Sequence, residues 1–417
     1  MSKITNIRAR EILDSRGNPT IETRVTLEGG AEGIASVPSG ASLGKYEAVS
    51  LYDNDPERYN GLGVLMAVKN VNEIIRAKLI GFDSENQLLI DETLITLDGT
   101  ENKSKLGANA ILSVSQGVCE AAAAVQKLAN YQYLGQLFGL KNNLLKVPTP
   151  TFNLINGGSH GAGNLDFQEF HVIPNIQKSY SDALRMGQEI YQATKKVLIR
   201  HKAVHSVGDE GGFAPNLFSN LDALQILVEG IKETNYEFRR DVFFGLDVAA
   251  GSFYKEGRYQ IRDRTVPLET ADFIDFYRDL LNQYPLLNLE DPLSEDDWDG
   301  WVKISHEFPQ TLIVGDDLLA TNKKRVAEAI KRKACSAILI KPNQIGTISE
   351  TLEVIRICRQ AGWKVIVSHR SGETNDDFIA DFSVGVGADF TKFGAPARGE
   401  RVAKYNRLLE IESELRA

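Results

Sequence analysis

Residues 242–247 read Val-Phe-Phe-Gly-Leu-Asp, a short apolar run typical of a buried strand that ends on a carboxylate. The pattern returns five times, and the runs end at Glu290, at Asp316, at Lys341, at Ser368 with His369 and Arg370, and at Lys392. After a first step of 43 residues, the steps are 26, 25, 27 and 24 residues, about the length of one strand plus one crossover helix. Amphipathic segments occupy the gaps, for example at 322–332 and 347–360. The spacing predicts six consecutive βα units.

Two further strands are predicted upstream of this series, at 151–155 and 167–173, with no helix between them. Two helical segments follow, at 181–200 and 221–232. Together with the six βα units, these elements predict a modified (β/α)8 TIM barrel of ββαα(βα)6 topology over residues 147–417. The active site of such a barrel lies at the carboxyl ends of its strands, where the residues that end the apolar runs would meet.

The first 146 residues follow a different pattern. Strands at 4–11, 20–27 and 31–37 are separated by Gly- and Pro-containing turns, which predicts an antiparallel meander. Helical segments at 64–79 and 109–128 complete an N-terminal α+β domain, residues 1–146. Pro148 and Pro150 favour extended backbone and mark the start of the C-terminal domain.

The composition of the chain disfavours several kinds of partner, location and cysteine chemistry. The chain has 417 residues, 42% of them hydrophobic, and a net charge of -9, which disfavours nucleic acid and anionic lipid as partners. No apolar run suggests a signal peptide or a membrane span, so we expect no membrane insertion and a cytoplasmic location. Cys119, Cys335 and Cys358 are far apart, which argues against disulfides and a thiolate metal site and favours core positions.

The residues at the predicted barrel mouth indicate a metal site. Asp247, Glu290 and Asp316 supply hard oxygen ligands without Cys or a His cluster, a set that suits Mg²⁺. Salt bridges at the barrel mouth are the alternative reading of these acids.

Cations stand beside the acids at the same strand ends. Lys341, Arg370 and Lys392 form a cationic wall suited to a phosphate ester. We expect neighbouring cations and metal ions to lower the pKa of Lys341, which would make it a general base for a proton next to a carboxylate. Glu210 lies in a Gly-rich loop and is a candidate acid for the leaving group.

At these residues the sequence resembles the enolase family, from the Asp-Ser-Arg-Gly-Asn-Pro-Thr run at 14–20 to the last helix. The motifs that carry the resemblance are Ser-Gly-Ala-Ser at 39–42, Asn-Gly-Gly-Ser-His at 156–160, Gln-Glu-Phe at 168–170, Gly-Asp-Glu-Gly-Gly-Phe-Ala-Pro-Asn at 208–216, Leu-Glu-Asp-Pro at 289–292, Gly-Asp-Asp-Leu at 315–318, Ile-Lys-Pro-Asn-Gln-Ile-Gly-Thr at 340–347, Ser-His-Arg-Ser-Gly-Glu-Thr at 368–374 and Gly-Ala-Pro-Ala-Arg at 394–398.

The resemblance implies reversible dehydration of 2-phosphoglycerate to phosphoenolpyruvate in glycolysis and gluconeogenesis, with two Mg²⁺ per active site. It implies that Lys341 takes the C2 proton and Glu210 protonates the departing C3 hydroxyl. The first ion would bind Asp247, Glu290 and Asp316, and the second would bind Ser42 on a mobile lid loop, residues 39–44. The substrate contacts it implies are His160, Glu169, Glu290, Asp316, Lys341, Ser368, His369, Arg370, Ser371 and Lys392.

The resemblance also implies a homodimer, with assembly to an octamer in some members. Some members are also found secreted or on the cell surface without a signal peptide, and bind plasminogen or an RNA-degrading complex as a secondary role. Two residues depart from the family pattern: Leu43 replaces the usual lid threonine, and Phe393 replaces a small hydroxyl residue. We expect these changes to affect lid closure, rate or affinity, not the reacting groups.

Alternative readings remain for the protein and for some residues. A related barrel enzyme acting on acid sugars or amino acids would carry a Lys-x-Lys pair where this chain has Gln168-Glu169. A scaffold or adhesion protein without catalysis is the second alternative. Asp209, Asp291 and Asp317 neighbour the chosen acids, and we expect them to support those acids. We expect structural or surface roles for four other histidines: His171, His201, His205 and His306.

Overall fold

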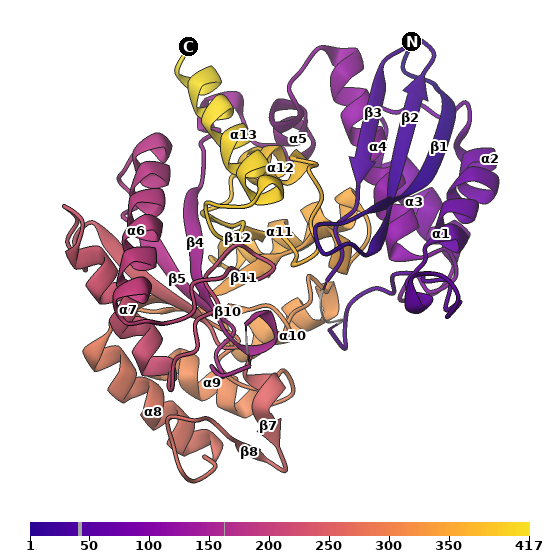
Figure 1. Cartoon of the computed structure of the whole chain (residues 1–417). Helices are drawn as coiled ribbons and strands as arrows, with labels where there is room; N and C mark the ends of the chain where they lie inside the picture. Colours follow the sequence, from indigo (N-terminus) through magenta and orange to yellow (C-terminus); the bar gives the residue numbers. More distant parts are fainter. Residues whose placement is uncertain (41–43, 162) are drawn as a thin grey trace.

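The computed structural model describes residues 1–40, 44–161 and 163–417. Its N-terminal part is a three-stranded sheet of β1 (Ile4–Leu13), β2 (Pro19–Leu27) and β3 (Glu32–Ser36), antiparallel in the order β1-β2-β3. The predicted meander is therefore confirmed. Helix α4 (Ala108–Gln126) packs against this sheet (Figure 1), and the approach is close. A Cβ on Gly33 would lie 2.1 Å from the carbonyl oxygen of Gly117, so only glycine fits there.

The helix predicted at 64–79 forms as three joined pieces. They are α1 (Leu65–Lys69), a π-helical segment (Asn70–Ile75) and α2 (Arg76–Leu79). Helices α3 (Gln87–Asp98) and α5 (Asn130–Phe138) complete this part of the chain. By length and composition alone α4 could cross a membrane, but 83% of its apolar window is buried inside the protein, as in a core helix.

Eight strands form a closed barrel in the order β10-β11-β12-β13-β4-β5-β6-β9, which confirms the predicted TIM-barrel fold. The strands are β4 (Thr149–Asn156), β5 (Glu169–Pro174), β6 (Val242–Asp247), β9 (Leu286–Glu290), β10 (Leu312–Gly315), β11 (Ala337–Ile340), β12 (Lys364–Ser368) and β13 (Phe390–Lys392). The three cysteines are free and buried, as expected.

Strand β5 runs antiparallel to both of its neighbours, β4 and β6. Its first residue, Glu169, therefore pairs with Asn156 and with Asp247, the last residues of those strands. A residue at the start of β5 thus reaches the same barrel mouth as residues at the ends of the parallel strands.

Helices cover the outside of the barrel (Figure 1). Helices α6 (Tyr180–Arg200) and α7 (Asn220–Lys232) follow β5, and six helices follow the remaining strands in turn: α8 (Thr270–Gln283), α9 (Trp298–Glu307), α10 (Lys323–Arg332), α11 (Ile348–Gln360), α12 (Phe378–Gly385) and α13 (Gly399–Arg416). A small hairpin of β7 (Tyr254–Lys255) and β8 (Arg258–Tyr259) precedes α8 and accounts for the long first step of the sequence pattern.

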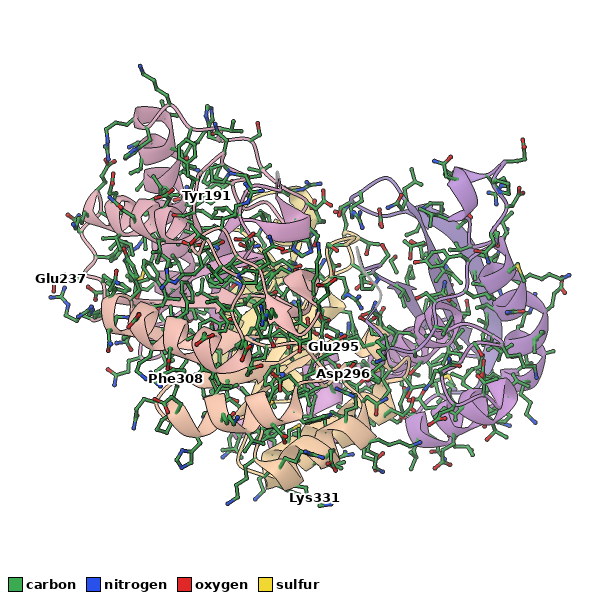
Figure 2. The ribbon with its side chains drawn as sticks, turned by 90° about the horizontal axis from the view of Figure 1, so that it is seen from below. Tyr191, Glu237, Glu295, Asp296, Phe308 and Lys331 are labelled. Atoms are coloured by element: carbon green, nitrogen blue, oxygen red, sulfur yellow. The ribbon has the colours of Figure 1, made fainter. Side chains whose placement is uncertain are left out.

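The N-terminal part reaches the barrel mouth through the segment after β3. Ser39 and Gly372 exchange two backbone hydrogen bonds, of 2.7 and 2.9 Å. Beyond residues 41–43, Lys45 and Tyr46 both contact the carboxylate of Asp296, at 2.9 and 2.6 Å. Asp296 lies on the side of the barrel that faces the N-terminal part (Figure 2). The ends of this segment are thus tied to two different barrel loops.

Candidate active site

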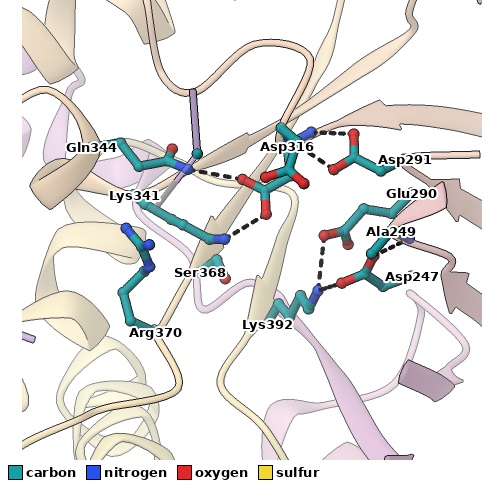
Figure 3. Close-up of polar contacts among 12 residues, drawn as sticks. Asp247, Ala249, Glu290, Asp291, Asp316, Lys341, Gln344, Ser368, Arg370 and Lys392 are labelled. Atoms are coloured by element: carbon teal, nitrogen blue, oxygen red, sulfur yellow. Dashed lines mark hydrogen bonds and ion pairs between the residues drawn. The ribbon is translucent and has the colours of Figure 1, made fainter. Parts of the chain in front are cut away.

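The barrel brings the predicted strand-end residues to one mouth (Figure 3). Asp247 and Glu290 are the last residues of the neighbouring strands β6 and β9 and are paired in register. Asp316 directly follows β10, and Lys341 directly follows β11. One cavity is lined by Glu47, His160, Gln168, Glu169, Glu210, Asp247, Ala249, Asp291, Asp316, Asp317, Lys341, Ser368, His369, Arg370, Ser371 and Lys392.

The ammonium of Lys392 lies at the centre of a carboxylate cluster. Its Nζ is 2.9 Å from Asp247 Oδ2, 2.8 Å from Glu290 Oε1 and 3.1 Å from Glu169 Oε1. Burial alone would lower the pKa of Lys392, but the three carboxylates, with Asp247 first, raise it well above its usual value. Lys392 is therefore firmly protonated and holds acids from β5, β6 and β9 together.

The single positive charge of Lys392 does not balance the negative charges of the three carboxylates around it. Burial raises the pKa of Glu290 well above its usual range, and the charge of Asp247 raises it further against the opposing effect of Lys392. By contrast, Lys392 lowers the pKa of Asp247 despite burial. A crowded set of buried carboxylate oxygens of this kind favours an additional cation, and its hard donors suit Mg²⁺.

Lys341 is paired with Asp316 rather than left among cations. Its Nζ donates to Asp316 Oδ2, while Gln344 Nε2 donates to the other carboxylate oxygen at 3.0 Å. Burial, Arg370 and Lys392 lower the pKa of Lys341, but Asp316 outweighs them and the pKa is raised. The predicted lowering of this pKa included the effect of bound metal ions and stays a prediction. Among the protein's own groups, the contact with Asp316, which the sequence pattern did not reveal, raises it.

Asp291 and Asp317 flank the predicted ligands, as expected of supporting residues. The Asp291 carboxylate accepts the backbone N–H groups of Asp316 at 3.0 Å and Asp317 at 2.7 Å, which fixes the start of the loop after β10. Oxygen atoms of Asp291, Asp316 and Asp317 lie within 4.8 Å of one another. Asp316 thus belongs to this acidic group and also acts electrostatically on Glu290 at the end of β9.

Arg370 forms a buried pair with Glu47, a residue that the sequence reasoning missed. Arg370 Nη1 and Nη2 donate to the two Glu47 oxygens at 2.9 and 3.2 Å, and Nη1 also donates to Asn343 Oδ1 at 3.1 Å. Glu47 also accepts from Gly44 N at 3.1 Å. A charged residue shortly after a glycine-rich loop was the available signal, but it is a weak one.

Glu210 lines the same cavity. Asn153 Nδ2 donates to its Oε2 at 3.0 Å, and its Oε1 lies 3.4 Å from His160 Nδ1 and 3.6 Å from His369 Nε2. Burial would raise the pKa of Glu210, but His160 and His369 lower it well below its usual range. The carboxylate is therefore ionised, and the nearest group that can transfer a proton to it is a histidine.

The two histidines differ in charge. Burial lowers the pKa of His160, but Glu210 and then Glu169 outweigh this effect and raise it to about 9. Burial lowers the pKa of His369, and Glu210 does not compensate. At neutral pH His160 is an imidazolium and His369 is a neutral ring.

The other predicted positions lie as follows. His171 is buried and its Nε2 is 3.0 Å from Glu169 Oε2, so its structural role is to orient Glu169. His201, His205 and His306 are exposed, away from the cavity. Phe393 is fully buried, with its ring 6.2 Å from that of Tyr405.

Two positions of the lid loop lie outside the described residues: Ser42, a predicted ligand of the second ion, and Leu43, a departure from the family pattern.

Comparison with known families agrees with this arrangement. Residues 4–134 match the model of the enolase N-terminal domain, and residues 144–417 match that of the enolase C-terminal TIM barrel domain. The two matches together span nearly the whole chain, including every described residue of the cavity. The protein therefore belongs to the enolase family.

Proposed function

We propose that the protein catalyses the reversible, Mg²⁺-dependent dehydration of 2-phosphoglycerate to phosphoenolpyruvate and water, a hydro-lyase reaction of glycolysis and gluconeogenesis. The observation that carries the proposal is that one cavity holds two separate groups of reacting residues. Lys341 is paired with Asp316, whereas Glu210 lies close to His160 and His369. Removal of a proton and a hydroxyl from adjacent carbons requires a base and an acid.

The described residues fit a divalent cation. Asp247, Glu290 and Asp316 would hold the first Mg²⁺, since they lie at the ends of neighbouring strands and are buried carboxylates close to one another. Burial, with the added charge of Asp247, raises the pKa of Glu290. Ser42 would hold a second ion. Bound Mg²⁺ would supply positive charge that stabilises an enolate, and by engaging Asp316 it would weaken the contact that raises the pKa of Lys341.

Lys341 is the proposed general base. Its Nζ is directed into the cavity from the end of β11, and without its present partner Asp316 it would face the lowering effects of burial, Arg370 and Lys392. A neutral amine at this position would take the C2 proton of 2-phosphoglycerate. Gln344 remains to hold Asp316 through the oxygen that does not contact Lys341.

Glu210 is the proposed acid for the C3 hydroxyl. As described it is ionised, so it must first gain a proton. The nearest titratable proton is on the His160 imidazolium, whose Nδ1 lies 3.4 Å from Glu210 Oε1. Because the pKa of His160 is the higher of the two, bound substrate would have to raise the pKa of Glu210 before this proton moves to the carboxylate. His160 would thus act as the proton source and Glu210 as the group that delivers the proton to the leaving oxygen.

Arg370 is the proposed partner of the substrate phosphate. Its guanidinium already binds a carboxylate through two nitrogens, the geometry that also recognises phosphate. Ser371, Ser368, His369, Glu169 and Lys392 line the same cavity and would contact the rest of the substrate. Substrate phosphate would take the place of the Glu47 carboxylate.

The test is the ultraviolet absorbance of phosphoenolpyruvate when purified protein is mixed with 2-phosphoglycerate, with Mg²⁺, with a chelator, and after Mg²⁺ is restored. We expect turnover that disappears with the chelator and returns with Mg²⁺. The Lys341→Ala variant should show no turnover under any of these conditions. Absence of turnover in folded wild-type protein with Mg²⁺ would contradict the proposal and favour a non-catalytic binding role.

A further inference from the structure

Arg401 reaches the active site from the first turn of the C-terminal helix, α13. Its side chain is fully buried, and it is among the largest fully buried side chains of the described residues. Neither the barrel pattern nor the catalytic roles above account for a buried arginine at this point. A buried guanidinium is costly unless each of its N–H groups has a partner, so its contacts show what it does.

The guanidinium donates to four acceptors. Nη1 lies 2.7 Å from His369 Nδ1 and 2.6 Å from the carbonyl oxygen of Arg370. Nη2 lies 2.6 Å from the carbonyl oxygen of Ser371 and 3.0 Å from that of Asp209. The two hydrogens of each terminal nitrogen therefore all have partners. The remaining nitrogen, Nε, is 3.4 Å from Glu400 Oε1.

The contact with His369 determines which ring nitrogen carries the proton. Arginine has donors and no acceptor, so His369 Nδ1 must be the acceptor in this hydrogen bond. A neutral imidazole with an unprotonated Nδ1 carries its proton on Nε2. Arg401 thus selects the Nε2–H form of His369 and disfavours the imidazolium, which would place an N–H against a guanidinium N–H.

The selected N–H is directed at the reacting groups. His369 Nε2 lies 3.6 Å from Glu210 Oε1, and it is a buried atom without a hydrogen-bond partner within the described part of the chain. His369 lines the cavity and is 2% exposed. The charged groups that face this ring are Glu210, Glu169 of β5 and Arg401 of α13. A donor without a partner at this point is available to the substrate or to Glu210.

The same guanidinium joins two loops that carry active-site residues. The carbonyl of Asp209 immediately precedes Glu210, and those of Arg370 and Ser371 belong to the loop after β12. Arg401 therefore holds the loop of the proposed acid and the loop of the proposed phosphate ligand at a set distance from each other.

We propose that Arg401 is a positioning residue that holds His369 as a neutral Nε2–H donor facing the leaving-group side of the cavity and ties the Glu210 loop to the 369–371 loop. The part concerning the leaving group rests on the proposed function. The tautomer itself does not, because it follows from contacts in the protein without substrate.

The first experiment is nitrogen NMR of the substrate-free wild-type protein, in which only the six histidines are labelled. The signal of His369 is assigned by its loss in His369→Gln. We expect Nδ1 to be unprotonated and Nε2 protonated at neutral pH, and the ring to resist protonation on mild acidification. A protonated Nδ1 at neutral pH would overturn the proposal, even if the enzyme proves active.

The second experiment compares Arg401→Gln and Arg401→Lys with Arg407→Gln. Arg407 is a matched control because it lies on the same helix and is also ion-paired, through its Nε to Asp381 at 2.7 Å, but makes no contact with the 369–371 loop in the structure. We expect Arg401→Gln to lower kcat about 10- to 100-fold, with a mixture of His369 tautomers. Arg401→Lys keeps the charge and one donor nitrogen, so it should recover part of kcat and part of the Nε2–H tautomer. Arg407→Gln should leave kcat and the tautomer unchanged.

Several results would decide against the proposal. A kcat loss in Arg401→Gln with an unchanged His369 tautomer, or an equal loss in Arg407→Gln, would mean that Arg401 only stabilises the fold. If Arg401→Gln does not fold, the wild-type spectrum still decides the tautomer. If wild-type protein does not dehydrate 2-phosphoglycerate, the proposed function fails while the tautomer measurement stands on its own.

Discussion

Two groups of barrel strands contribute to the same cavity in different ways. The first group is β6 and β9 to β13, and the second is β4 and β5. In the first group, the proposed ligands of the first ion and the proposed base lie at or directly after the carboxyl end of a parallel strand, as with Asp247, Asp316 and Lys341. In the second group, Glu169 lies at the start of an antiparallel strand, His160 ends a short 3-10 helix and Glu210 lies in a loop. The regular part of the barrel supplies the proposed metal ligands and the base, and the irregular part supplies the proposed acid.

Lys392 connects the two groups. It ends β13, yet it contacts Glu169 of β5 as well as Asp247 and Glu290. The two sides are therefore electrostatically linked although they have different backbone origins. If the division of labour is real, substitutions on the two sides should affect different steps of the reaction.

The largest effect is expected for Lys341→Ala. Loss of the proposed base should stop both removal of the C2 proton and formation of phosphoenolpyruvate, by about 10²–10⁴-fold or more. The measurements are exchange of the C2 proton of 2-phosphoglycerate with deuterated water and the rate of phosphoenolpyruvate formation. Lys331→Ala, at an exposed lysine of α10, is the control. Exchange at the wild-type rate in Lys341→Ala would remove Lys341 as the base.

A slightly smaller and more selective effect is expected for Glu210→Gln. The amide cannot deliver a proton to the C3 hydroxyl, so dehydration should fall about 10²-fold or more while some C2 exchange remains. The same two assays apply, with Glu237→Gln at an exposed position as the control. If Glu210→Gln and Lys341→Ala lose exchange equally, the two sides of the cavity do not act on separate steps.

A moderate effect on binding is expected for Arg370→Lys. The variant keeps the charge but cannot contact phosphate through two nitrogens in a fixed plane, so KM for 2-phosphoglycerate should rise about tenfold or more, with a smaller change in kcat. Steady-state kinetics measures both constants, and Arg356→Lys at an exposed position of α11 is the control. An unchanged KM would place the phosphate elsewhere.

The βα units of the barrel could be predicted from the sequence because the spacing between their strand ends has a physical cause. A buried parallel strand and its crossover helix need about 25 residues, so the polar residues that end the apolar runs mark one mouth. The antiparallel direction of β5 could not be predicted from spacing, since an apolar run has the same pattern in either direction. Glu169 and His160 therefore depended on the family resemblance, and Glu210 was a candidate only through its Gly-rich loop.

Contacts between distant residues were the other limit. Glu47 and Arg370 are separated by more than three hundred residues, and Arg401 meets His369 only because the first turn of α13 lies against the loop after β12. The contact of Lys341 with Asp316 could not be predicted for the same reason, although it outweighs the surrounding protein cations and raises the pKa of Lys341. Charge type is readable from sequence, but the partner of each charge is set by the tertiary structure.

The smallest effect is expected for His160, which belongs to the β4 and β5 group, and it concerns the pH dependence of stability. Its pKa is raised to about 9, from 6.5 in an unstructured chain, chiefly by Glu210 acting against burial. A raised folded-state pKa stabilises the protein below about pH 6.5, and this contribution is lost as the pH rises through about 9. Unfolding free energies in urea at about pH 6 and pH 9 should therefore differ by an amount of order 1–3 kcal/mol from this residue.

In His160→Gln this part of the pH dependence should be absent, whereas His306→Gln, at an exposed position of α9, should keep it. Dehydration by the wild-type protein should also decline through the same pH range, because the imidazolium that supplies the Glu210 proton is lost, while C2 exchange depends on Lys341 and should not follow it. A decline of both steps together, with the same midpoint, would mean that the proton donor side and the base side titrate as one unit and that their separation is only geometric.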